Sequence, residues 1–262
     1  MNTSLLLIRK EFVQMVRDYK MIWLPIVFVF LGCTQPIVTY YLPNILEALG
    51  GGQGITIDSS LISQKGGEVL ASTLGSQFDQ LGIIILVITF MGIIQSDKSN
   101  GMLAFILTRP VTIISYLNGK VVSNYLIAVL SVSIGFFVSY LYVNYLFTEV
   151  AFYHMMIALL LYLLWVLFIV SFTMMVSAIF RSQGMIALIS IIFLIGCRII
   201  VNLIPKIDFI NPASLSKHAM EVLVTGTIHT SVISTVLVEF IWILLIFCIT
   251  NYWISHRKDY HD

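Results

Sequence analysis

The chain has 262 residues, of which 59% are hydrophobic and only 10% are charged. A soluble domain of this length does not carry such a composition, so we expect an all-α membrane protein with several spans. The formal net charge of +1 gives no indication of a nucleic-acid partner, and none is expected.

The N-terminal residues 3–20 are predicted to form an amphipathic helix. Apolar side chains recur at three- and four-residue spacing, and Lys10, Gln14 and Arg17 share another face. We expect this helix to lie in the membrane interface, in contact with lipid; the alternative is a helix packed on a soluble partner. The apolar face comprises Leu5, Ile8, Phe12, Met15 and Tyr19.

Six apolar segments are long enough to cross the membrane as helices, since a span needs roughly 20 residues. The second has only a short uncharged run, and Gln77, Asp79 and Gln80 are predicted to lie at its outer end. Arg181 to Gly184 indicates a tight turn between the fourth and fifth spans. The predicted spans are residues 21–41, 78–95, 121–147, 151–180, 185–204 and 231–254.

Two longer segments are predicted on the outer side, residues 42–77 and 205–227. The glycines of GGGQG lack the lysine and the strand-to-helix context of a phosphate loop, so they are interpreted as a hinge. Pro205 and Pro212 end the fifth span and require either a re-entry or a surface loop. Neither segment is large enough to be a separate domain, so residues 1–262 are expected to form one transmembrane domain.

The distribution of Lys and Arg predicts the orientation. With both termini in the cytoplasm, ten of these residues lie inside and three outside, while Arg198 remains within a span. The inverted topology would need an exception at almost every loop. The inner set is Arg9, Lys10, Arg17, Lys20, Lys98, Arg109, Lys120, Arg181, Arg257 and Lys258, and the outer set is Lys65, Lys206 and Lys217.

The segment 97–120, DKSNGMLAFILTRPVTIISYLNGK, is the longest polar-bearing break between apolar runs. It contains a short stretch that is apolar at Met102, Phe105 and Ile106 and ends at Pro110. Such a helix can insert as a rigid knob into a groove of a soluble partner, or it can cover lipid at the interface. The residues alone leave both interpretations open.

Taken together, these features resemble the permease subunits of ABC-2 type transporters, whose transmembrane domain is type V exporter-like. The family pattern is an acidic residue, a basic residue, a glycine, a short hydrophobic helix, Pro-Val, and a Gly-Lys opening the third span. Here these are Asp97, Lys98, Gly101, residues 102–107, Pro110 with Val111, and Gly119 with Lys120. The outer stretch YLPNILEALGGGQGITI is similar to that of the nitrous-oxide reductase maturation and gliding-motility exporter permeases.

The resemblance implies that the segment 97–120 couples the spans to an ATPase. Many relatives have Thr-Leu-Glu after the glycine where this chain has Met102, Leu103 and Ala104, so docking would depend on hydrophobic contact. The coupling residues implied are Asp97, Lys98, Gly101, Met102, Leu103, Phe105, Ile106, Leu107, Arg109 and Pro110.

The chain contains no Walker A sequence, so it is not expected to be an enzyme, and the ATPase must be a separate polypeptide. The resemblance implies two cytoplasmic ATPase subunits, which bind ATP and Mg, and two permeases as a homodimer or a related heterodimer. This chain is expected to bind no cofactor or metal itself. It would export an amphipathic, peptide-like or lipid-like cargo across a bacterial cell membrane.

Two further features concern the membrane interior. Arg198 and Glu239 lie at matching depths, at about 1.5 Å per residue, and are predicted to form an ion pair. Such a pair could join two adjacent helices as a structural contact, or it could line a substrate or gating path. The alternative function for the chain is an ion-coupled secondary transporter that uses this pair. Ser131, Gly135 and Ser139 form a small-residue seam for close helix packing, within the chain or with a second copy.

Overall fold

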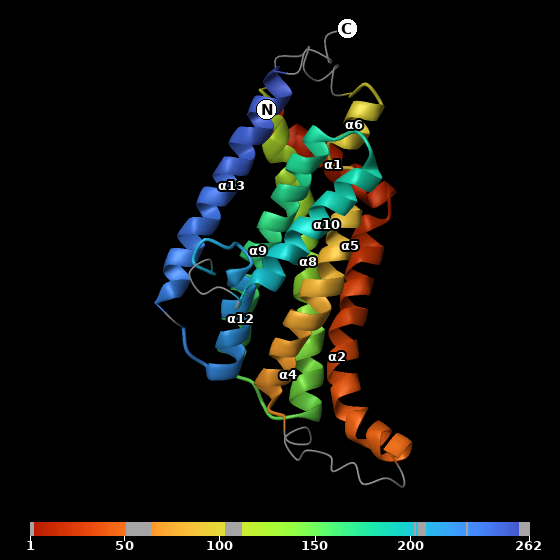
Figure 1. Cartoon of the computed structure of the whole chain (residues 1–262). Helices are drawn as coiled ribbons and strands as arrows, with labels where there is room; N and C mark the ends of the chain where they lie inside the picture. Colours follow the sequence, from red (N-terminus) through yellow and green to blue (C-terminus); the bar gives the residue numbers. More distant parts are fainter. Residues whose placement is uncertain are drawn as a thin grey trace.

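The computed structural model describes residues 3–50, 64–102, 112–201, 203, 208–228 and 230–256. Within these ranges every regular element is a helix (Figure 1), which confirms the predicted fold class. The elements are α1 (Thr3–Arg17), α2 (Lys20–Gly50), α4 (Gly66–Ser72), the π-helix η1 (Thr73–Gly82), α5 (Ile83–Phe90), α6 (Gln95–Ser99), α8 (Ile113–Leu146), α9 (Phe152–Ile179), α10 (Gln183–Ile200), α12 (Ser214–Thr225) and α13 (Ser231–His256).

Six helical stretches of the described chain are long and apolar enough to span a membrane, as predicted. α9 is the most buried of them and lies among α5, α8, α10, α12 and α13. α1, α6 and the last turns of α13 lie at one end of the bundle, called here the α6 end (Figure 1). The stretches are Lys20–Ile45, Gly66–Ser99, Ile113–Leu146, Phe152–Ile179, Gln183–Ile200 and Ser231–His256.

The second span begins earlier than predicted, at Gly66 instead of residue 78. The polar residues Ser72, Ser76 and Gln77 do not mark an outer end, because they are hydrogen-bonded to Gln35 of α2. Gln35 Nε2 donates to Ser72 Oγ (3.3 Å), and Gln35 Oε1 accepts from Ser76 Oγ (3.2 Å) and Gln77 Nε2 (3.1 Å). The predicted outer segment 42–77 is therefore shorter, since α2 also continues to Gly50.

α2 and α8 approach each other at glycines. A Cβ on Gly32 would meet the carbonyl oxygen of Gly135, and a Cβ on Gly135 would lie 2.6 Å from the carbonyl carbon of Phe28. Ser131 and Ser139 of the same seam are fully buried. The small residues of α8 therefore serve packing within the chain, the first of the two alternatives that the sequence left open.

In the segment between α10 and α13, the described residues include a helix, α12 (Ser214–Thr225), that packs into the bundle. α12 packs against α9, α4, η1 and α13, and ends at Gly226 with φ +67°. Asn211 Nδ2 donates to the Cys197 carbonyl (2.7 Å), and Trp242 Nε1 donates to the Ile210 carbonyl (2.9 Å). These bonds hold the chain before α12 against both α10 and α13.

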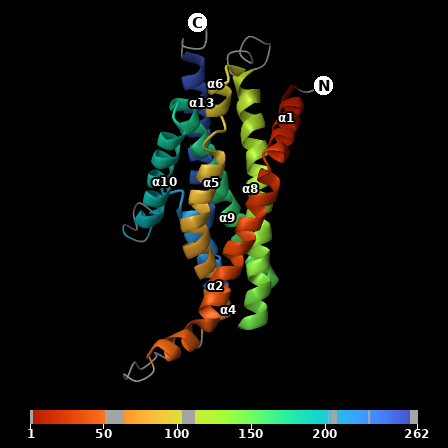
Figure 2. The same cartoon turned by 90° about the vertical axis from the view of Figure 1, so that its right-hand side faces the viewer.

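α1 packs against the first turns of α8 (Figure 2). Met15 is buried, Phe12 packs on the core and Ile8 is half-buried, so these three predicted positions share an inward face. Tyr19 does not belong to it: its φ is +57° and its side chain is 70% exposed, because the helix ends before it. The side chain of Leu5 lies outside the described residues.

Candidate functional site

The second span breaks between α5 and α6, and one hydroxyl of α9 supports the break. Ser177 Oγ accepts from the backbone N–H groups of Ile94 (3.2 Å) and Gln95 (3.0 Å) and donates to the Met91 carbonyl (2.9 Å). Backbone groups that the break leaves without helical partners are thereby satisfied. α6 is fixed to α9 at a defined place.

Lys98 of the recognised motif binds the C-terminal end of α9. Its Nζ donates to the carbonyls of Ser177 (2.8 Å), Ala178 and Phe180 (3.1 Å). The last carbonyls of a helix lack partners within it, and a cation there is also favoured by the helix dipole. Lys98 thus attaches the start of segment 97–120 to the fourth span.

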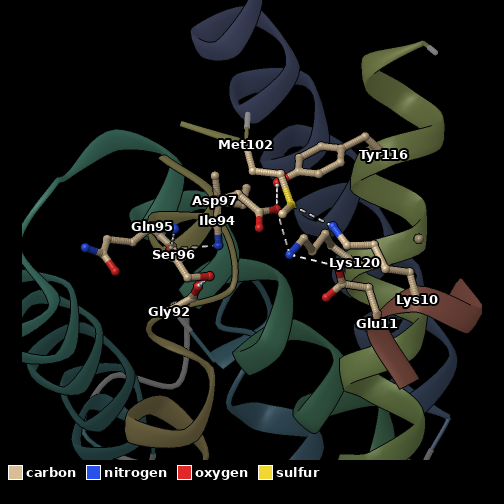
Figure 3. A network of polar contacts seen from close by, with 12 residues as sticks. Lys10, Glu11, Gly92, Ile94, Gln95, Ser96, Asp97, Met102, Tyr116 and Lys120 are labelled. Atoms are coloured by element: carbon tan, nitrogen blue, oxygen red, sulfur yellow. Dashed lines mark hydrogen bonds and ion pairs between the residues drawn. The ribbon is translucent and has the colours of Figure 1, made fainter. Parts of the chain in front are cut away.

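Asp97 and Lys120 form a buried ion network that extends to the N-terminal helix (Figure 3). Lys120 Nζ lies 2.8 Å from Asp97 Oδ2 and 3.0 Å from Glu11 Oε1. The side chains of Lys120, Asp97 and Glu11 are 3%, 5% and 9% exposed. The Tyr116 hydroxyl donates to the same Asp97 oxygen at 2.7 Å. Three elements distant in sequence, α1, α6 and α8, therefore meet at one ammonium group.

Gly101 turns the chain out of α6. Its φ of +68° lies in the left-handed region, which favours glycine, and its N–H donates to the Lys98 carbonyl (3.2 Å). Met102 follows, and its Sδ accepts from Lys10 Nζ of α1 (2.8 Å). The remaining predicted coupling residues, Leu103, Phe105, Ile106, Leu107, Arg109 and Pro110, lie outside the described residues.

The α6 end therefore has a specific mechanical arrangement. Asp97 and Lys98 lie on α6, before residues 103–111, and Lys120 lies on α8, after them; all three are held by charge-assisted contacts to other helices. Such contacts are stronger and more directional than those between neutral groups. A force on the intervening segment would act on α1, α8 and α9 together.

A second polar cluster lies inside the bundle and corrects one prediction. Arg198 does not pair with Glu239; its Nε lies 2.5 Å from Asp79 Oδ2 of η1. Ser216 of α12 donates to the same oxygen, and Tyr162 of α9 lies beside the carboxylate. The pairing was missed because Asp79 was assigned to the outer end of its span, whereas its side chain is 0% exposed.

Glu239 is buried on α13, with 1% exposure. Neither of its carboxyl oxygens has a hydrogen-bond partner in the part of the chain that the structure describes. The described residues also contain no group of three or more His, Cys, Asp or Glu side chains that could hold a metal ion.

Sequence reasoning also missed Glu11, Tyr116 and Ser177. Glu11 carried a signal, because it falls three residues after Ile8 and four before Met15, on the inward stripe of α1. A charge on an apolar stripe predicts a buried partner. Tyr116 and Ser177 carried no such signal, since hydroxyl groups are ordinary in apolar helices.

Residues 5–260 match the model of the family described as ABC-2 family transporter protein. The chain belongs to this family and is a multi-pass membrane component of a transporter. It is 35% identical over 226 residues to the uncharacterized transmembrane protein YxlG of Bacillus subtilis (strain 168). That match covers 86% of this chain and 87% of YxlG.

Proposed function

We propose that this chain is the permease subunit of an ATP-driven exporter, and that a separate ATPase docks on the segment 97–120. One observation carries the proposal: both ends of this segment are held to other helices by charge-assisted contacts. Lys98 binds the end of α9, and Lys120 binds Asp97 and Glu11. A loop that only covered lipid would not need this anchoring.

The anchoring provides a route for force. When the ATPase closes on ATP, a docked knob would move, and its movement would reach α1, α8 and α9 through the ion network. A soluble groove would hold the apolar face of residues 102–107, since burial of Met, Phe and Ile side chains stabilises such contacts. We propose two ATPase subunits and two permeases, a homodimer or a heterodimer, in the working unit.

The orientation is part of the proposal. The α6 end would face the cytoplasm, where ATP is available, with both termini on that side. The excess of Lys and Arg in the loops on that side supports this orientation. The opposite orientation would make docking of a cytoplasmic ATPase impossible, so a docking test also tests the topology.

The surface of the bundle supports an amphipathic cargo. A groove of about 370 Å³ lies between α8 and α13. It is lined by apolar side chains such as Leu117 and Phe247, and the amides of Asn118 and Asn251 also face it. Such a lining suits a molecule with an apolar body and a polar end.

The test is Phe105→Asp, which places a charge in the expected apolar contact. Phe152→Asp is the matched control, because Phe152 is exposed at the first turn of α9, at the end of that helix opposite Lys98. An acidic residue is tolerated well in a first helical turn. The measurements are co-purification of the ATPase and ATP turnover in lipid.

We expect Phe105→Asp to lose the ATPase or its stimulation by the permease, while Phe152→Asp behaves like the wild type. Both variants should insert in the membrane in normal amounts. If Phe105→Asp retained both the ATPase and its turnover, the segment 97–120 would not be the docking site.

A further inference from the structure

Glu239 is an acidic side chain buried in a membrane span, and the described residues provide no counter-ion for it. Its exposed fraction is 1%, and no described residue offers a hydrogen-bond partner to either carboxyl oxygen. Arg198, the cation at a similar depth, is bound to Asp79. An isolated carboxylate in an apolar surrounding is strongly disfavoured relative to the neutral acid. The packing therefore requires the carboxyl group of Glu239 to carry its proton.

Polar groups next to Glu239 on α13 lead toward α12, although Glu239 itself is not hydrogen-bonded to the first of them. Thr235 lies one helical turn from Glu239 on α13, which places their side chains on one face. The Thr235 hydroxyl donates to the Ser231 carbonyl (2.9 Å) and lies 3.4 Å from His218 Nε2. His218 Nδ1 lies 2.9 Å from Glu221 Oε2, and the Glu221 side chain is 33% exposed. Imidazole and hydroxyl groups both donate and accept, so they can pass a proton.

Other titratable groups on the helices around α13 are either bound to a different residue or carry no positive charge that could pair with Glu239. α10 contributes Cys197, whose thiol lies within electrostatic range of Glu239, and Arg198, which is bound to Asp79. On α9, Tyr162 lies beside Asp79. On α12, Lys217 is bound by Asp208 (3.1 Å), and on α8, Lys120 is bound by Asp97 and Glu11. None of these cations pairs with Glu239, so among the described residues a proton is the remaining positive charge for it.

We propose that Glu239 is a proton-binding site within the sixth span, and that it exchanges its proton through Thr235 and His218. On release, a change of the Glu239 rotamer brings its carboxyl group to the Thr235 hydroxyl. The Glu239 O–H bond breaks as the Thr235 oxygen takes the proton, and Thr235 gives its own hydroxyl proton to His218 Nε2. The resulting imidazolium is stabilised by the Glu221 carboxylate and gives the proton to water at the exposed end. This site does not depend on the ATPase and goes beyond the proposed transport function.

The proposal has a structural consequence. An ionised Glu239 has no partner in the present packing, so α13 would have to admit water or a cation beside it. The protonation state of Glu239 therefore selects between two packings of α13. The ligand class of the site is the proton, and a cationic group that reached the carboxyl would displace it.

The experiment is infrared spectroscopy of the purified full-length permease in lipid, near neutral pH and in both H₂O and D₂O. A neutral carboxylic acid gives a carbonyl band that is distinct from the carboxylate bands and shifts on deuteration. Glu239→Gln keeps the shape of the side chain but removes this group. Glu149→Gln is the matched control, because Glu149 is exposed.

We expect the acid band in the wild type and in Glu149→Gln, and its loss in Glu239→Gln. If the wild type and Glu239→Gln had the same spectrum in this region, Glu239 would be ionised and the proposal would be wrong. A hydrophobic carbodiimide, which reacts with protonated carboxyl groups, should also label Glu239 in the wild type. Absence of that label on the Glu239 peptide would contradict a protonated site in the membrane.

The exchange route is tested separately with His218→Gln, which can still hydrogen-bond to Thr235 but cannot take up a proton. After a jump to high pH, the acid band of Glu239 should disappear more slowly in this variant than in the wild type. An unchanged rate would overturn the route through His218. His256→Gln is the control, since His256 is exposed at the far end of α13 and bonds only locally.

Discussion

Lys120→Met should be one of the most destabilising single substitutions at the α6 end. The substitution removes the ammonium group between Asp97 and Glu11 but keeps most of the side-chain volume. Both carboxylates are then left in a site where their side chains are only 5% and 9% exposed. Removing one partner of a buried pair costs about 3–5 kcal/mol, because the remaining charge is uncompensated.

The melting temperature of the purified permease in detergent or lipid is the measurement. At about 2–4 °C per kcal/mol for a chain of this size, the expected fall is roughly 6–20 °C. The triple variant Lys120→Met, Glu11→Gln, Asp97→Asn should recover most of the loss, because it removes the uncompensated charges. Lys65→Met is the control: Lys65 is exposed, and its change should stay within about 0.5 kcal/mol.

The triple variant distinguishes charge from packing. If the melting temperatures of Lys120→Met and of the triple variant fell by the same amount, the loss of stability would come from lost packing contacts and not from the two uncompensated carboxylates. If Lys120→Met were as stable as Lys65→Met, the ion network would not exist as described, and the anchoring argument would lose its basis.

Two other changes test the interior of the bundle by the same melting measurement. Asp79→Asn and Arg198→Met should each lower the free energy of unfolding by about 3–5 kcal/mol, whereas Glu239→Gln should change it little. The reverse order would indicate that Arg198 pairs with Glu239 instead of Asp79. Gly135→Ala should lower the free energy of unfolding by about 1–3 kcal/mol, because the added Cβ would overlap the α2 backbone. Gly196→Ala should be neutral or stabilising by about 0.5–1 kcal/mol, since nothing lies within 4 Å of that position. Equal effects of the two substitutions would refute the close approach of α2 and α8.

The membrane architecture was predictable because the apolar runs match the thickness of the hydrocarbon. The start of the second span was not predictable in this way. Ser72, Ser76 and Gln77 are polar, and a window that counts hydropathy treats them as an end. Their partner, Gln35, lies on another helix, and only the packing of α2 beside η1 reveals that they are satisfied.

The motif at the α6 end can be recognised in the sequence, but the contacts that its residues make cannot. The sequence indicates an acidic, a basic and a glycine position at Asp97, Lys98 and Gly101. It does not indicate that Lys98 binds the end of α9 or that Asp97 binds Lys120, because both contacts join helices separated by a loop or by a whole span. The left-handed turn at Gly101 is the exception, since a glycine after a short helix predicts it.

The prediction of an Arg198–Glu239 pair failed for a reason that applies to other membrane proteins. Matched depth is necessary for an ion pair between spans, but the rotation of each helix decides which side chains meet. Asp79 meets Arg198 because η1 turns it inward, in a span where it was assigned to the outer end. The consequence is that Arg198 and Asp79 are paired with each other, and Glu239 has no partner among the described residues.

α12 connects both of these sites. Ser216 and Met220, four residues apart, face Asp79 and Arg198. His218 lies about 200° around the helix from Ser216 and contacts Thr235 on α13. A shift or rotation of α12 would therefore disturb the Asp79–Arg198 pair and the path to Glu239 at the same time. α12 also packs against α9, and the other end of α9 is bound by Lys98. A movement of α9 that begins at the α6 end can therefore reach both polar sites through a continuous series of contacts.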